Sequence, residues 1–207
     1  MAIWTISAQA GTAGREVATE LAARAGVPLR DRLELVAHAR ALDPAAGVDE
    51  DIEARVGGRL NALVLGAAMT AGSAEACREL QLRHALPQLA RQVMREVARQ
   101  PGVVLATAAF VPLADHPGAV HVRLQAPREW RVAAYARAEV VDRRRAEHAI
   151  DHEDHVQRDW VRKLFHVDVD DASLFSLVVD ASRFSVDRIV DVLLAAAAGA
   201  ELQAASS

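Results

Sequence analysis

The sequence predicts an α/β protein in which a parallel sheet of about five strands carries helices on both faces. Short apolar segments with the character of strands alternate with longer segments of helical periodicity along the whole chain. One of these segments, 103–106, is a continuous apolar run that contains β-branched residues, as is typical of a parallel strand buried on both faces. Ligands of such sheets bind at the carboxyl ends of the strands, which places residues 11–15, 106–110 and 125–128 around one crevice.

The chain opens with an apolar strand from Ile3, a loop of small residues and a helix that begins directly after it. Backbone N–H groups converge at such a helix start and attract anions. Against the Walker A pattern, the chain has Gln9 at the first glycine, Gly14 at the second, Arg15 at the lysine and Glu16 at the serine or threonine. The segment alone fits either a phosphate loop of altered chemistry or a plain tight turn.

Further elements follow in order. The first helix ends at Gly26, a short strand is expected at 27–29, and Asp31 is placed to cap a helix over 32–41. Residues 43–47 are predicted to form a turn, and the pattern from there to Gln100 is helical, with interruptions at 57–58, 72–73 and Pro87. The second half is predicted to contain strands at 120–124 and 177–179, helices at 127–141, 146–165 and 186–198, and a flexible tail at 199–207. Polar alternation places the 120–124 strand nearer the sheet edge.

Bulk composition excludes several classes of protein. The net charge of −4 argues against a general nucleic-acid binder. A lone cysteine, Cys77, cannot form an internal disulfide, which favours a reducing compartment. Neither a signal peptide nor an apolar run of membrane-spanning length is visible, so we expect a cytoplasmic protein without a membrane partner.

Arginines are concentrated between residues 128 and 162. Such residues on a mobile lid can neutralise a phosphoryl group during its transfer. The alternative is a solvated helix face with partners four residues away, such as Glu139 and Glu147. The arginines of this segment are Arg128, Arg131, Arg137, Arg143, Arg144, Arg145, Arg158 and Arg162.

Two further clusters are weaker. His148, His152 and His155 have the spacing of one helix face, but a metal would need a further ligand from elsewhere, so a solvated polar face is favoured and no metal site is assigned. The acidic loop 168–171 fits turns and caps better than a Mg²⁺ site.

Several segments together resemble the cytidylate kinase-like family of nucleoside monophosphate kinases. In the first loop, Arg15 and Glu16 reproduce the family's own Arg-Glu pair, and Ile6, Ser7, Gly11 and Gly14 also match. Pro28–Leu35, the strand 121–127 and the helical segments up to Leu177 match in order and spacing. Arg131 occupies the position of a lid arginine. The resemblance runs from Ile3 to about Leu193 and is weakest between 44 and 100.

The resemblance implies a three-layer P-loop kinase fold within one domain, 1–198, that transfers the γ-phosphoryl of ATP, with Mg²⁺, to a CMP-like acceptor. Residues 44–100 would form a helical acceptor region able to dimerise, and 128–165 an arginine-rich lid. The loop residues expected to bind the nucleotide phosphates are Gly11, Thr12, Ala13, Gly14, Arg15 and Glu16. The expected catalytic residues are Arg15, Arg131, Arg137, Arg158, Arg162 and Asp154, with Asp154 orienting Arg158 or Arg162.

Departures from the family pattern keep a second hypothesis open. Residues 106–109 read Ala-Thr-Ala-Ala where the family has Gly-Arg-Gly, Ala8 replaces an arginine, and Gln157 stands where a lid arginine is common. Ala13 replaces a loop glycine, which matters if the backbone there needs a positive φ. The alternative is therefore a non-catalytic descendant of the fold that binds a nucleotide or a protein partner.

Overall fold

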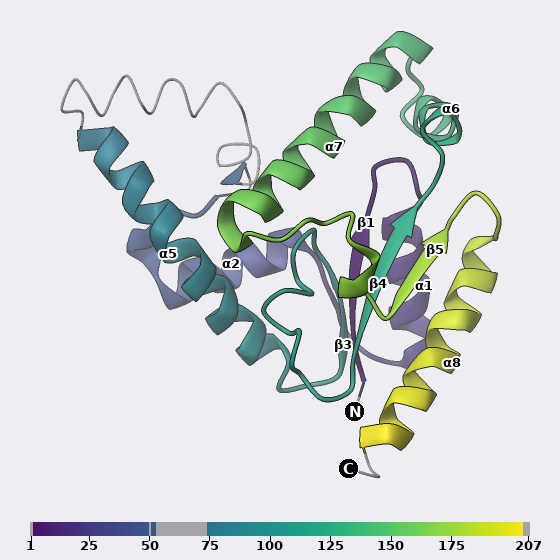
Figure 1. Cartoon of the computed structure of the whole chain (residues 1–207), viewed down its shortest axis with the longest axis horizontal. Helices are drawn as coiled ribbons and strands as arrows, with labels where there is room; N and C mark the ends of the chain where they lie inside the picture. Colours follow the sequence, from purple (N-terminus) through teal and green to yellow (C-terminus); the bar gives the residue numbers. More distant parts are fainter. Residues whose placement is uncertain (1, 50, 53–73, 205–207) are drawn as a thin grey trace.

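The computed structural model describes residues 2–49, 51–52 and 74–204. Its sheet has five parallel strands in the order β2-β3-β1-β4-β5, which confirms the predicted fold class (Figure 1). The strands are β1 (Ile3–Ala8), β2 (Leu29–Arg30), β3 (Gly102–Leu105), β4 (Ala119–Gln125) and β5 (Leu177–Asp180). The α-helices are α1 (Gly14–Ala25), α2 (Arg32–Leu42), α5 (Ala74–Val97), α6 (Arg128–Ala138), α7 (Arg143–Phe165) and α8 (Val186–Ala204), and the 3₁₀-helices are η1 (Pro44–Ala46) and η2 (Ala172–Leu174).

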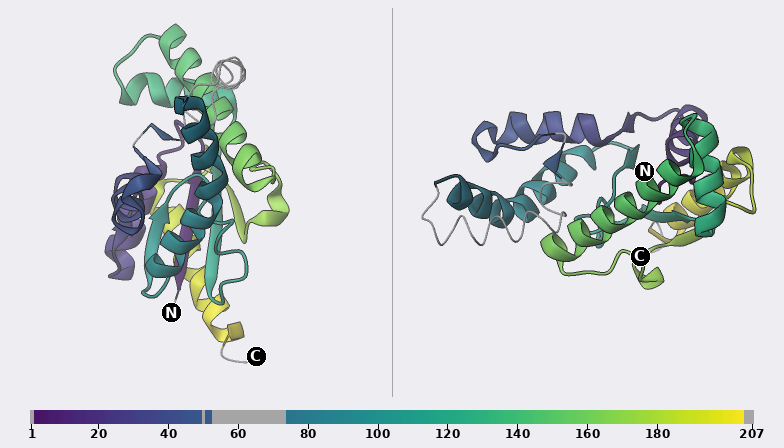
Figure 2. Two further views of the ribbon diagram at one scale, coloured as in Figure 1. Left: turned by 90° about the vertical axis from the view of Figure 1, so that its left-hand side faces the viewer. Right: turned by 90° about the horizontal axis from the view of Figure 1, so that it is seen from above.

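Alternate residues of the central strand β1 face two separate cores. Trp4 and Ile6 pack with α1 and α8 on one face, while Ile3 packs with α2, α5 and the end of α7 on the other. The hairpin of α6 and α7 stands above the carboxyl ends of the strands (Figures 1 and 2). We call this hairpin the lid. The result is the three-layer arrangement that the sequence predicts.

Strand β4 lies next to the edge strand β5, in agreement with the expectation that it is nearer the sheet edge. Its alternating polar residues His121 and Arg123 are nevertheless buried. His121 is bound by the Thr5 hydroxyl at 2.8 Å, and Arg123 donates to the Ser7 hydroxyl at 2.9 Å. These partners on β1 offset part of the cost of burial, while Nε of Arg123 has no partner among the described residues.

The helices differ from the sequence prediction in three regions of the chain. Helix α6 ends at Ala138, and Asp142 caps α7 by accepting from the Arg145 N–H. Pro87 does not interrupt α5, which runs from Ala74 to Val97 around it. Helix α8 continues past Gly199 to Ala204 instead of ending at 198, because the residues after the glycine are mostly good helix formers and one glycine costs only about 1 kcal/mol.

The predicted acceptor region, 44–100, is described only in part, since residues 50 and 53–73 lie outside the described residues. Within the part of the chain that the structure describes, no helix has both the length and the apolar character needed to cross a bilayer.

Candidate active site

A cleft of about 610 Å³ opens at the carboxyl ends of β1 and β3, beneath the lid. This volume is in the range of small-molecule sites, about 300–1,000 Å³. Five of the six loop residues expected to bind phosphate line it: Gly11, Ala13, Gly14, Arg15 and Glu16. Ala106 and Thr107 line it from the end of β3, and Trp130 and Tyr135 from α6. The segment 125–128, expected at the same crevice, does not line it.

The loop conformation depends on small residues at defined positions. Gly11 has φ +81°, and a Cβ there would lie 2.7 Å from the Arg131 carbonyl oxygen. A Cβ at Gly14 would overlap that of Ala8. Ala13 adopts the left-handed conformation, with φ 55° and ψ 32°, at the N-cap of α1. The positive φ that a glycine would favour is thus present here in an alanine, at a cost of about 1 kcal/mol.

The start of α1 presents unpaired N–H donors to the cleft. No side chain caps the helix. The Thr12 N–H donates to the Gln9 carbonyl, and the next N–H with a backbone acceptor is that of Val17, which donates to the Ala13 carbonyl. Among the described residues, the N–H groups of Ala13, Gly14, Arg15 and Glu16 have no acceptor. Donors left free at a helix start suit an anion.

Arg15 extends into this cleft and is held by the start of α2. Its Nη1 lies 3.2 Å from Oδ2 of Asp31, while the side chain stays 65% exposed. Asp31 also caps α2 by accepting from the Leu33 and Glu34 N–H groups. Burial raises the pKa of Asp31, but the Glu34 N–H and the Arg15 guanidinium outweigh it and lower the pKa overall. The ion pair therefore persists at neutral pH and positions a permanent positive charge.

Oxygen ligands of the kind that Mg²⁺ prefers are also present. Glu16 and Glu153 line the cleft and make no ion pair within the described part of the chain. The Thr12 hydroxyl is not such a ligand, because Thr12 is buried outside the cleft and its Oγ1 donates to the Gln9 carbonyl at 2.6 Å. The donor set fits a magnesium ion held by carboxylates, directly or through water.

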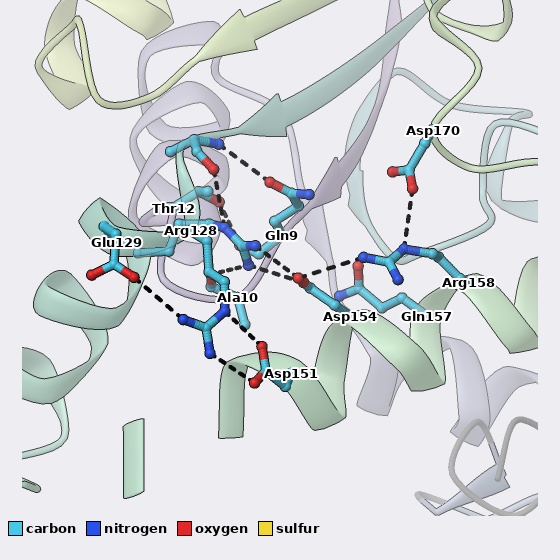
Figure 3. Close-up of polar contacts among 12 residues, drawn as sticks. Gln9, Ala10, Thr12, Arg128, Glu129, Asp151, Asp154, Gln157, Arg158 and Asp170 are labelled. Carbon is cyan, nitrogen blue, oxygen red and sulfur yellow. Dashed lines mark hydrogen bonds and ion pairs between the residues drawn. The ribbon is translucent and has the colours of Figure 1, made fainter. Parts of the chain in front are cut away.

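Arg131 belongs to the lid helix α6, where its side chain is buried, and it does not line the cleft. Its two terminal nitrogens bind the carboxylate of Asp154 at 2.9 and 2.7 Å, and Nε donates to the Ala126 carbonyl. Nη1 also donates to the carbonyl of Ala10 at 3.3 Å, so this side chain ties the lid to the phosphate loop (Figure 3).

Arg158 continues this polar network away from the cleft. It lies 3.8 Å from Asp154 and 3.1 Å from Asp170 (Figure 3). Asp170 in turn binds the buried Arg123. Asp154 thus orients Arg131 first and Arg158 second. It does not orient Arg162, which pairs with Asp159 one turn before it.

The remaining predicted lid arginine, Arg137, is exposed on α6. It makes no hydrogen bond or ion pair with any described residue and does not line the cleft. The structure therefore brings together Arg15 and the loop, and separately Arg131, Asp154 and Arg158. Arg137 and Arg162 stand apart from both groups.

Comparison with known proteins decides the family. The sequence profile described as the cytidylate kinase-like family matches residues 3–183. The chain belongs to the cytidylate kinase-like family. A comparison with curated proteins gave no match.

Solved structures support the kinase fold of this family member. An uncharacterized protein from Eubacterium ventriosum aligns with a TM-score of 0.66 and 17% identity over 96% of this chain and 98% of its own. A gluconokinase from Sinorhizobium meliloti aligns with a TM-score of 0.50 and 15% identity over 100% and 97%. The Thermus thermophilus protein TT1252 gives 0.48 and 21% over 94% and 96%.

Two glutamines of this kinase-like site were not singled out as site residues by the sequence. Gln9 accepts from the Ala126 N–H through Oε1, which joins the loop to the end of β4. Gln157 donates to the Ala8 carbonyl at 3.1 Å and lines the cleft. The only signal in the sequence was their position, Gln9 inside the loop and Gln157 at the place of a lid arginine. The Gln157 amide thus bridges α7 and β1 at a position where a family arginine would carry charge.

The three histidines of α7 differ in their surroundings. His148 and His152 stack with ring centroids 6.4 Å apart, and His155 faces Asp159. Among the described residues, no group of three or more metal-ligating side chains occurs.

Proposed function

We propose that the protein is a phosphotransferase that moves the γ-phosphoryl group of ATP to a phosphomonoester, with CMP as the acceptor suggested by the family. One observation carries the proposal. The free N–H donors at the start of α1 and the Arg15 guanidinium face the same cleft, and that cleft has room for a ligand. Fixed donors that meet developing charge are the main source of catalysis in phosphoryl transfer.

The roles of the loop residues follow from their positions. The free N–H groups of Ala13, Gly14, Arg15 and Glu16 cradle the phosphates, and Arg15 takes the place of the Walker lysine, held by Asp31. Glu16 and Glu153 would hold Mg²⁺, which neutralises phosphate charge when bound. Arg137 has no competing partner among the described residues, so closure of the lid is the movement that would bring it to the phosphates. Arg158 and Arg162 would have to exchange their present carboxylate partners to act there.

A second function, nucleotide binding without turnover, is favoured by a different observation. None of the lid arginines lines the cleft in the described structure, and Arg131, Arg158 and Arg162 are engaged by carboxylates. If these pairs do not open, the phosphates are bound but the transferring group is not neutralised. Under either function we place the protein in the cytoplasm, where ATP is abundant, and expect any homodimer to use the 47–100 region.

Calorimetric titration with ATP–Mg²⁺, followed by coupled ADP release with CMP, dCMP, UMP and AMP, tests the proposal. We expect ATP binding and acceptor-dependent ADP release. Arg15→Ala should weaken ATP binding at least tenfold, whereas Arg24→Ala serves as the control, because Arg24 lies on the same helix but pairs with Asp191 away from the cleft. Binding without release supports the non-catalytic function. Absence of ATP binding contradicts both.

A further inference from the structure

A second hollow, of about 120 Å³, lies beside the phosphate cleft. It is enclosed by α2, α5, the segment after β3 and the end of α7. Arg32 is the one charged residue among its described lining residues, and the others are apolar, including Val36, Val93, Ala109, Trp160 and Phe165. The hollow is therefore chemically different from the polar cleft next to it.

The two spaces adjoin, because Arg32 and Ala106 line both of them. A ligand in the hollow would have one end beside the phosphate loop. Arg32 is exposed and forms no ion pair within the described ranges. An arginine in this state at the junction suits a phosphate group, which a guanidinium binds through paired hydrogen bonds.

The wall of the hollow is a poor match for a nucleobase. Three residues of the Ala-Thr-Ala-Ala segment, Ala106, Ala108 and Ala109, line it where the family pattern has an arginine between glycines. A cytosine base would bring an amino donor and two acceptors against a described lining in which only Arg32 and Trp160 carry polar side-chain groups, both of them donors, so that no side chain there accepts from the amino group. Each polar group buried without a partner costs about 1–3 kcal/mol.

We propose that the hollow holds the body of the phosphoryl acceptor, and that this acceptor is a phosphomonoester of a compact hydrocarbon rather than of a nucleoside. The inference rests on the proposed function and names its substrate class. The hollow approaches the size of an engineered cavity in another protein, about 150 Å³, that binds benzene. The acceptor's phosphate lies at Arg32 and faces the loop.

The reaction balances without a further reactant. An oxygen of the dianionic acceptor phosphate forms a bond to the γ-phosphorus of ATP. The bond from that phosphorus to the β,γ-bridging oxygen breaks, and its electron pair leaves with ADP. The organic product is a diphosphate monoester, and no proton has to be removed from the attacking oxygen.

The test uses the full-length protein with ATP–Mg²⁺ and three probes: 3-methylbutyl phosphate, benzyl phosphate and CMP. We expect ADP release with at least one hydrocarbon probe at a kcat/KM at least tenfold above that for CMP. Ala109→Phe should fill the hollow and weaken the binding of the hydrocarbon phosphates at least tenfold, with the affinity for ATP unchanged. Ala23→Phe makes the same change on the exposed face of α1 and should alter neither.

Arg32→Gln provides a second test in case the Ala109→Phe variant does not fold, because Arg32 is exposed and its replacement should leave the fold intact. The Arg32→Gln variant should bind benzyl phosphate at least tenfold more weakly and should bind benzyl alcohol with unchanged affinity. A kcat/KM for CMP above that of both hydrocarbon probes would overturn the assignment and leave phosphotransfer intact. If ATP does not bind, the proposed function fails, but calorimetry with benzyl phosphate alone still tests whether the hollow binds a hydrocarbon phosphate. Binding that is lost in Ala109→Phe supports the assignment of the hollow, and absence of binding to the parent protein overturns that assignment.

Discussion

Arg131 and Asp154 form a two-pronged ion pair that fastens α6 to α7, with side chains only 4% and 10% exposed. The same guanidinium reaches the Ala10 carbonyl of the phosphate loop. Arg131, which occupies the position of a lid arginine in the family pattern, therefore supports the loop in this conformation and does not line the cleft.

Replacement of Arg131 by methionine should therefore destabilise the whole domain. It leaves the Asp154 carboxylate buried without its partner, which costs about 3–5 kcal/mol. Urea unfolding would measure the loss, and ATP affinity should fall together with turnover. Arg131→Met combined with Asp154→Leu should recover part of the stability, because no charge is then left unpaired. Arg137→Ala, on the same helix but exposed, should change the unfolding free energy by less than about 0.5 kcal/mol. A normal unfolding curve for the Arg131 single variant would contradict this account.

The contact between Ala8 and Gly14 gives a second prediction. Gly14→Ala places two Cβ atoms in the same space and should destabilise the protein by about 1–3 kcal/mol. The double variant Ala8→Gly with Gly14→Ala removes the overlap and should regain most of that loss in thermal unfolding. If the double variant is no more stable than Gly14→Ala alone, close packing of β1 on α1 is not the reason for this glycine.

Val140 is a β-branched residue with φ 54° at the turn between α6 and α7, and it is 90% exposed. Val140→Gly should stabilise the protein by about 1 kcal/mol, since it relieves the left-handed backbone and loses almost no buried surface. Val192→Gly is the matched control, because Val192 is exposed within α8 and should lose about 1 kcal/mol of helix stability. Urea midpoints that shift in the same direction for both variants would count against this explanation.

His121 should make stability depend on pH. Burial lowers its pKa below the ordinary 6.5, more than the backbone contact with Leu113 raises it. The unfolded chain therefore takes up a proton before the folded one, and stability that is full above pH 6.5 declines as the pH falls below it. Unfolding free energies at pH 8, 6 and 5 should fall less steeply in His121→Gln than in the parent protein. The exposed His148→Gln should retain the parent's slope, and a His121 variant that does so would refute this origin.

The sequence predicts strands and helices well because their signals are local. The apolar run at 103–106 and the Asp31 cap each depend on a few neighbouring residues, and both elements lie within a residue or so of their predicted places. The partner of Asp154 was not predictable in this way. Arg158 is four residues away from Asp154 on the same helix, whereas Arg131 reaches Asp154 only through the packing of α6 against α7. No spacing along a single helix carries that information.

Polar residues in β4 show the same limit. Alternation identifies a strand, but burial of Arg123 depends on Ser7, 116 positions earlier, and on Asp170 in a distant loop. The first loop was easier to predict because its glycines and its helix start are contiguous. Even there, the sequence showed only that Ala13 replaces a loop glycine, and the structure was needed to show that this alanine adopts the positive φ of a glycine.

The position of β1 at the middle of the sheet has a consequence for synthesis of the chain. Ile3 pairs with Gly102 and Ala119, which are synthesised long after it. At about 5–20 residues per second, the ribosome needs about 5–20 s to supply the first of these partners. During that interval a newly made apolar strand has both of its hydrogen-bonding sides unpaired. The nascent protein should therefore depend on chaperones until its second half emerges, and a fragment ending near residue 100 should not fold.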